Sequence, residues 1–228
     1  MKKIITTLVI MICFFAGFAQ KDVTTFLGIP VDGYVPEMRK QLIAKGFSPQ
    51  KYLDEEYFTG EFNGTKVRVY IVTNNNKVYR IMLCDDINLD EADIKIRYNR
   101  LVRQFENNNR YISTDSYTIA DDEDIAYEML VHNKKYQAVY FQNPEKEKWD
   151  TLAIQEKMRS EILKKYTEEQ LQNPTEEISE DIQNLSLNYA FEIISKKPVW
   201  FCITERLGMY SIAMYYDNEY NHANGEDL

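Results

Sequence analysis

Histidine and cysteine are scarce in this chain of 228 residues, which carries two histidines and three cysteines. His132 ends a predicted helix and His222 lies in a polar tail, so neither lies in a pattern that indicates imidazole catalysis. The sequence also lacks the short His and Cys spacings of a zinc site, any glycine-rich phosphate loop and any nucleophile elbow. We therefore predict no catalytic residue, no metal ligand and no cofactor.

Basic residues are outnumbered, with 27 lysines and arginines against 36 acids and a formal net charge of −9. Nucleic-acid binding needs clustered Lys and Arg side chains that neutralise phosphates. The composition therefore argues against a nucleic-acid partner and against an anionic membrane surface. The partners left open are an unknown protein or a glycan.

Glycine and proline are also few, at eight and six residues, and no Ser/Gly/Pro-rich linker divides the chain. Lys2 and Lys3 precede an uncharged run to Phe18, and Gly17 and Ala19 place small residues at a cleavage position. This pattern is typical of a secretory signal peptide over residues 1–19, and the run is shorter than the roughly 20 residues of a membrane span. We expect residues 20–228 to form a single exported domain, periplasmic or extracellular, without a membrane span.

Two cysteines, Cys84 and Cys202, remain after cleavage near Ala19. An exported protein can oxidise such a pair to a disulfide. Cysteine is equally at home as a small buried side chain, so the sequence leaves both states open.

What the sequence does contain is a helix followed by a β-meander in residues 26–85. Val35, Met38 and Leu42 follow helical spacing over residues 35–45, and Gly46 is a typical C-terminal stop. Asn63-Gly64 is a strong hairpin signal.

A two-residue hairpin loop places Phe62 opposite Thr65 and Phe58 opposite Val69, with the apolar side chains on one face. For the next turn, in residues 74–76, a three-residue loop pairs Ile71 with Tyr79, and the sequence favours it because the apolar face stays continuous.

A second and larger version of this unit is predicted over residues 90–217. Asp90 caps a helix, residues 121–124 open a second one, and strands follow at 135–142, 199–204 and 210–216. Residues 145–196 read as two helices joined by a tight connection, an αα-hairpin that interrupts the second meander. Residues 217–228 are polar and are predicted to be frayed.

The opening Phe26-Leu27-Gly28-Ile29-Pro30-Val31-Asp32-Gly33 and the later Phe58-x-Gly60-x-Phe62-x-Gly64 resemble a group of exported Bacteroidetes proteins with no assigned activity. The resemblance covers most of residues 26–142 and 199–220. It implies two helix-plus-meander units in one antiparallel sheet, a topology similar to β-lactamase inhibitor proteins. The 145–196 hairpin is not part of that pattern.

Side chains on the predicted strands supply the candidate binding residues. Tyrosines on an exposed sheet face can contact a sugar or a protein, although tyrosine also covers half-buried sheet faces. The candidate residues are Tyr57, Tyr70, Val72 and Tyr79. Asp150-Thr151-Leu152 resembles a Bacteroidetes O-glycosylation site, with Thr151 as the acceptor.

We therefore predict an α+β protein that is a non-catalytic binding or protein-interaction module. The alternatives are a carboxylate-dependent hydrolase acting between the two units and an inhibitor of another exported enzyme. The densest acidic sets lie at residues 85–93 and 121–124, where each immediately precedes a helix and capping alone accounts for them.

Overall fold

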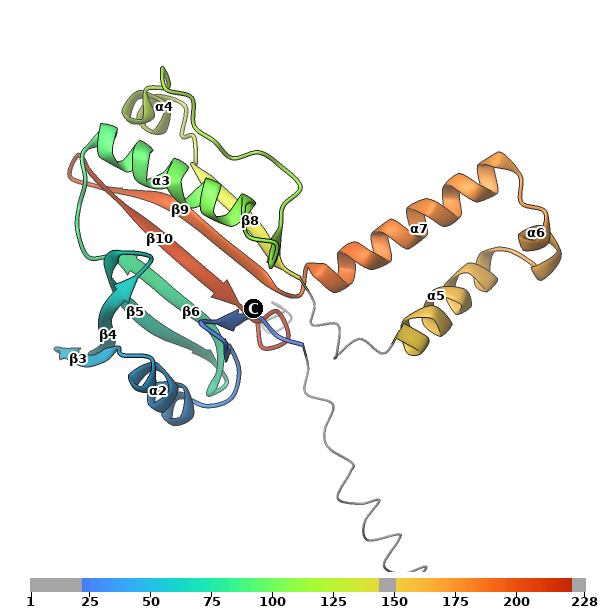
Figure 1. Ribbon diagram of the computed structural model, residues 1–228, viewed down its shortest axis with the longest axis horizontal. Coiled ribbons are helices and arrows are strands. Elements are labelled where there is room, and N and C mark those ends of the chain that lie inside the picture. The colour runs from blue at the N-terminus through green and yellow to red at the C-terminus, as the bar shows by residue number, and fades with distance from the viewer. Residues whose placement is uncertain (1–21, 144–150, 223–228) are drawn as a thin grey trace, which may run out of the picture.

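The computed structural model describes residues 22–143 and 151–222 (Figure 1), so the predicted signal peptide lies outside the described residues. The described chain forms helices on one side of a large antiparallel sheet. In chain order its elements are β1 (Thr25–Phe26), β2 (Ile29–Pro30), α2 (Val35–Ala44), β3 (Ser48–Tyr52), β4 (Glu55–Phe62), β5 (Thr65–Asn74), β6 (Lys77–Asp85), α3 (Glu91–Glu106), β7 (Tyr111–Ile112), α4 (Ile125–Val131), β8 (Gln137–Gln142), α5 (Thr151–Lys165), α6 (Glu168–Gln172), α7 (Glu176–Ile194), β9 (Pro198–Arg206) and β10 (Met209–Asp217).

The eight-stranded sheet has the strand order β3-β4-β5-β6-β10-β9-β8-β7, and every pair in it is antiparallel. One meander, β4-β5-β6, therefore meets the other, β8-β9-β10, where β6 pairs with β10. The helices α5, α6 and α7 are inserted between β8 and β9. The predicted α+β fold with two meanders in one sheet and an inserted helical hairpin is confirmed.

The Asn63-Gly64 hairpin has the predicted register, with Phe62 opposite Thr65 and Phe58 opposite Val69. Both turn residues have positive φ, 50° for Asn63 and 73° for Gly64, as a tight hairpin turn of this kind requires. Phe58, Phe62 and Val69 are all buried on the same face. Local turn chemistry and the apolar alternation agree here.

The predicted three-residue loop between β5 and β6 is wrong. Asn75 and Asn76 form a two-residue loop with φ of 48° and 63°. A β-bulge next to Val72 then shifts the register by one residue, so that Ile71 lies opposite Ile81 rather than opposite Tyr79. The bulge keeps the apolar face continuous by a different route from the one predicted.

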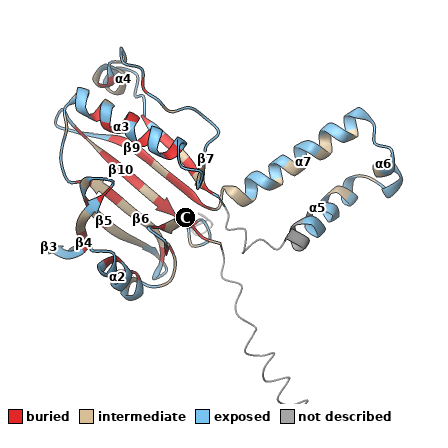
Figure 2. Ribbon diagram, in the orientation of Figure 1, coloured by how far each residue is buried: buried red, intermediate tan, exposed pale blue. Residues whose placement is uncertain are grey.

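Helices α2, α3 and α4 lie on the same face of the sheet, which we call the inner face (Figure 1). Asp90 caps α3 as predicted, since its side chain accepts a hydrogen bond from the Asp93 N–H at 2.9 Å. Below α3, the Tyr98 and Phe201 rings meet edge to face with centroids 5.2 Å apart. Figure 2 shows that buried residues concentrate on the strands beneath these helices.

The polar segment after β10 is not frayed up to residue 222. Asn218 is fully buried, and its side chain donates to the Val31 carbonyl at 2.7 Å. Asn221 donates to Asp32 at 2.7 Å and to the Val78 carbonyl at 2.9 Å. The prediction failed because the side-chain amides of Asn218 and Asn221 donate hydrogen bonds to main-chain carbonyls of the first unit. Local sequence does not reveal such long-range contacts.

Candidate functional site

The sheet face opposite α2, α3 and α4 is here called the outer face (Figure 1), and within the described residues α7 touches it at the β8 edge, where Phe191 meets Phe141. Side chains from six adjacent strands line up across it in one row. Tyr70 lies opposite Met82, Met82 opposite Tyr215, Tyr215 opposite Trp200 and Trp200 opposite Val139. Tyr57 extends the row by stacking on Tyr70. At about 4.8 Å per strand, this outer-face row is about 24 Å long.

The aromatic rings of the outer-face row pack against one another rather than lying flat on the sheet. Trp200 and Tyr215 stack with centroids 3.9 Å apart and planes 17° apart. Tyr57 and Tyr70 stack at 5.7 Å and 30°. The Arg80 guanidinium carbon lies 4.9 Å from the Tyr215 ring centroid. The row therefore presents ring edges and a methionine, because several of its ring faces are already covered.

Asp217 fixes the positions of two hydrogen-bond donors on the outer face, the Arg80 guanidinium and the Trp200 indole N–H. Its carboxylate accepts hydrogen bonds from Arg80 Nε at 2.6 Å and Arg80 Nη2 at 2.8 Å, and from Trp200 Nε1 at 2.9 Å. The hydrogen bond to Asp217 is the main reason that the pKa of Arg80 is raised. The Asp217 side chain is only 5% exposed, so this pair fixes the orientation of Arg80 beside the rings.

Three of the four predicted binding residues lie on the outer face. Tyr57 and Tyr70 belong to the row, and Val72 lies opposite Arg80 beside it. Tyr79 lies at the β-bulge, and its ring meets the His222 ring edge to face at 5.2 Å instead of joining the row.

Sequence reasoning missed several members of this surface. The strand alternation that points Val199 and Phe201 inward also points Trp200 outward, so the signal for part of the surface was present. The missed residues are Arg80, Met82, Val139, Trp200, Tyr215 and Asp217.

Cys84 and Cys202 also lie on the outer face, and both are free thiols. The disulfide considered from the sequence is therefore not formed. Ala213 on β10 lies opposite both of them, so they are separated by two strand spacings, about 10 Å. A disulfide requires Cα atoms less than about 7 Å apart. Burial raises the pKa of both thiols.

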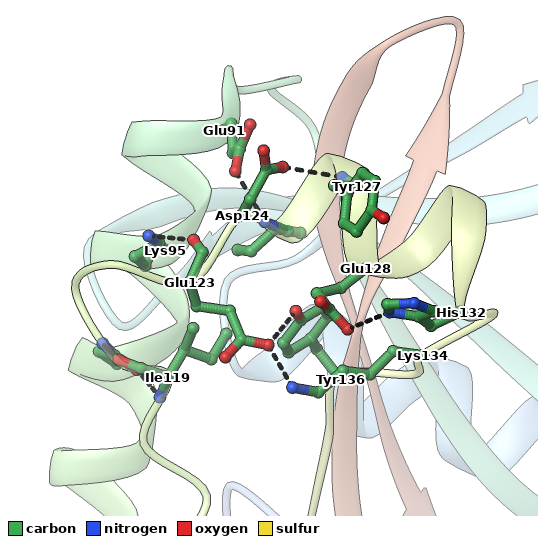
Figure 3. A network of polar contacts seen from close by, with 12 residues as sticks. Glu91, Lys95, Ile119, Glu123, Asp124, Tyr127, Glu128, His132, Lys134 and Tyr136 are labelled. Carbon is green, nitrogen blue, oxygen red and sulfur yellow. Dashed lines mark hydrogen bonds and ion pairs between the residues drawn. The ribbon is translucent and has the colours of Figure 1, made fainter.

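The acidic set at residues 121–124 builds the attachment of α4 rather than a catalytic pair (Figure 3). Asp124 caps α4 through the Tyr127 N–H at 2.8 Å, and Glu123 accepts hydrogen bonds from Lys134 and, at 2.6 Å, from the Tyr136 hydroxyl. Hydrogen bonds from Lys134 and then Tyr136 lower the pKa of Glu123. These acids serve as capping and bridging groups, as the capping interpretation of the sequence predicts.

The same network ties the loop before α4 to α3. Lys95 donates to the main-chain carbonyls of Asp121 and Glu123, at 2.8 Å and 2.6 Å. Glu91 accepts from the Ile125 N–H at 2.7 Å (Figure 3). His132 contacts Glu128, four residues before it, at 2.9 Å at the end of α4.

Two cavities lie along α3, where the first unit meets the second. The smaller, of about 240 Å³, is lined by Asp85, Asp93, Arg97 and Arg100 among others. Asp85 is already engaged, because Arg97 donates to both of its oxygens at 3.1 and 3.2 Å and both side chains are buried. The larger cavity, of about 320 Å³, has no carboxylate among its described lining residues.

The inserted helices α5, α6 and α7 form an arm, residues 151–194, that projects beyond the sheet (Figure 1). None of its side chains that the structure describes is buried. Lys165 at the end of α5 and Tyr166 just after it both contact Asp181 on α7 at 2.6 Å, and Phe191 touches Phe141 on β8 with ring centroids 5.7 Å apart. Thr151 is the first residue of α5; its side chain and Asp150 lie outside the described part, so the glycosylation prediction stays open.

Within residues 22–143 and 151–222, no group of three or more His, Cys, Asp or Glu side chains is arranged to hold a metal ion. None of the helices in those ranges is long and apolar enough to cross a membrane. No family model, curated protein or solved structure matches this chain. The resemblance to exported Bacteroidetes proteins therefore stays a prediction.

Proposed function

We propose that this protein is an exported, non-catalytic interaction module that binds a protein partner through the outer face of its sheet. The observation that carries the proposal is the outer-face row, with Trp200, Tyr215 and Arg80 at its centre. Trp, Tyr and Arg are the residues most often found at the energetic centres of protein interfaces. Met82 adds a flexible apolar side chain that adapts to a partner.

The packing of the rings favours a protein over a glycan. Sugars bind aromatic residues by placing their C–H groups over an open ring face, whereas Trp200 and Tyr215 cover each other at 3.9 Å. The ring edges, the Met82 side chain and the half-buried Val139 suit the apolar side chains of another protein. Another exported enzyme, inhibited by this contact, is one partner of that kind.

The carboxylate hydrolase considered from the sequence has less support. It needs two facing acids in a concave site, one with a raised pKa. Of the cavities along α3, the larger has no acid among its described lining residues, and the smaller has Asp85, which is paired with Arg97, and Asp93. Among the residues that the structure describes, the pKa is shifted for two carboxyl groups, Glu123 and Asp181, and it is lowered for both.

A capture experiment with two matched variants tests the proposal. Residues 20–228 are immobilised and exposed to periplasmic and extracellular extract of the producing organism. Met82→Glu places a charge in the outer-face row, and Leu130→Glu places the same charge at an 86% exposed position on α4. We expect one protein to be retained by the native chain and by Leu130→Glu, and retention to fall at least tenfold with Met82→Glu.

Melting curves confirm that both variants are folded. Equal retention by all three chains, or retention of a polysaccharide that depends on Trp200, contradicts the proposal. Export is tested separately by N-terminal sequencing of the mature protein, whose first residue is expected to be Gln20.

A further inference from the structure

The larger cavity along α3 has an aromatic floor built by both units. Phe62 comes from the tip of the β4–β5 hairpin, Phe105 from the last turn of α3 and Tyr216 from β10. All three are buried, with 3–8% of each residue exposed. A volume of about 320 Å³ lies at the small end of the range in which proteins bind small molecules.

The rim of this cavity is rich in side-chain amides. Asn63 at the hairpin tip and Gln104 and Asn108 at the end of α3 all line it, together with the hydroxyl-bearing residues Thr25 and Tyr111. An amide both donates and accepts hydrogen bonds, as a ligand hydroxyl also does. Asn63, Gln104 and Asn108 are exposed, and Asn108 presents its amide NH₂ group to a ligand because its Oδ1 already accepts the Arg110 N–H.

Among the described residues that line this cavity, Arg110 is the charged one. Its main chain is held from both sides: its N–H donates to Asn108 Oδ1 at 3.1 Å, and its carbonyl accepts from the Asn143 N–H at 2.8 Å. Its guanidinium forms no ion pair within the ranges that the structure describes. Arg110 lines the same cavity as Tyr216; burial raises the pKa of Tyr216 well above its ordinary value, and the positive charge of Arg110 opposes that rise.

We propose that this cavity binds an acidic sugar residue, a ring-shaped carboxylate with several hydroxyl groups. The apolar C–H side of the sugar ring contacts the apolar floor without stacking on an open ring face, its hydroxyls meet the amides of Asn63, Gln104 and Asn108, and its carboxylate pairs with Arg110. A neutral sugar leaves the guanidinium without a partner. An aromatic carboxylate leaves the amides without partners, and inorganic phosphate has no ring to cover the floor.

Titration with D-glucuronate and D-glucose, followed by NMR or calorimetry, tests this proposal directly, because the two sugars differ only in the carboxylate. We expect glucuronate to bind the native chain at least tenfold more tightly than glucose or benzoate. Arg110→Gln is expected to weaken glucuronate binding about tenfold or more, since it removes a charged hydrogen-bond partner. Arg103→Gln is the matched control, because Arg103 lies on the last turns of α3, close to Arg110 in the chain, is exposed and does not line the cavity.

Three outcomes overturn the proposal: no binding of glucuronate, equal binding of glucuronate and glucose, or equal loss of binding in the Arg110 and Arg103 variants. Benzoate binding as tightly as glucuronate also overturns it, because the amides would then contribute nothing. The Met82→Glu variant is expected to bind glucuronate normally. This site can therefore fail or hold independently of the outer-face interaction.

Discussion

Arg80 and Asp217 face each other across β6 and β10, the two strands at which the two meanders meet, and form a bidentate ion pair. The pair ties the first unit to the second on the outer face. Asp217 also accepts the Trp200 indole N–H, so one carboxylate orients two side chains of the proposed interface.

Replacement of Asp217 by alanine is expected to lower the free energy of unfolding by about 3 kcal/mol, because it leaves a partly buried guanidinium and an indole N–H without their partner. Urea unfolding measures the loss. The control is Glu56→Ala, which removes a pair with Arg39 whose side chains are about 40% exposed, and a loss below about 1 kcal/mol is expected there. Equal losses in the two variants would show that the Arg80–Asp217 pair contributes no more to the free energy of unfolding than the exposed Arg39–Glu56 pair.

Removal of the helical arm is expected to leave the sheet folded. β8 and β9 are already neighbours where the arm departs, since the Gln142 N–H donates to the Lys197 carbonyl at 2.9 Å. A short turn that replaces residues 144–195 therefore closes a hairpin without moving either strand. We expect the melting temperature to change by less than about 4 °C.

The same arm-deleted chain separates two binding surfaces. It is expected to keep the partner that Met82→Glu loses. Loss of that partner on deletion would assign the contact to the arm instead of the sheet, and failure to fold would show that the arm contributes to the core.

Acid is expected to act on the bridge between Glu123 and its donors Lys134 and Tyr136. The folded pKa of Glu123 lies below its ordinary value of 4.5, so its stabilising contribution is complete above pH 4.5 and is lost as the pH falls through the folded value. Glu123→Gln is therefore expected to be less stable than the native chain at pH 7, with the difference shrinking below pH 4.5. Urea midpoints between pH 7 and pH 3 measure this.

Asp122→Asn is the control for Glu123→Gln, because Asp122 is the neighbouring acid in the chain and is exposed. Its difference from the native chain is expected to stay small at every pH. If the stability difference between the native chain and Glu123→Gln grew as the pH fell, it would have the opposite sign to the one that a lowered pKa of Glu123 requires.

Cys84 and Cys202 are expected to stay reduced in air after cleavage of the signal peptide. Two thiols should be titrated in the unfolded chain without added reductant, and in the folded chain both should react slowly at pH 8, because burial raises the pKa of each. Cys84→Ser should leave one slow thiol. A disulfide-linked monomer would contradict the placement of Ala213 between the two residues.

Where the sequence carried a strong local signal, the structure agrees with it. The Asn63-Gly64 turn, the Asp90 cap and the alternation over Val199, Phe201 and Ile203 each depend on a few neighbouring residues. The β5–β6 register was missed because a bulge beside Val72 offsets the two-residue loop. The only mark of the bulge in β6 is a spacing of three residues between buried Val78 and Ile81, where regular alternation has two.

The candidate surfaces were predicted only in part. Tyr57 and Tyr70 were recognised on adjacent strands, but their connection to Tyr215 and Trp200 requires β6 to pair with β10. These strands are separated in sequence by the whole second unit, and no local pattern fixes which strands of two meanders meet. The cavity with Arg110 likewise combines a hairpin tip and a helix end from different units.

The sequence by itself determined the elements and their buried sides, because turn chemistry, helix caps and apolar periodicity act over a few residues. The tertiary structure decided which strands meet, and with that it assembled the outer-face row, separated the two cysteines and closed the cavity along α3. These are long-range pairings, selected by how two apolar faces pack into one core, and they are encoded in the whole chain rather than in any one stretch of it.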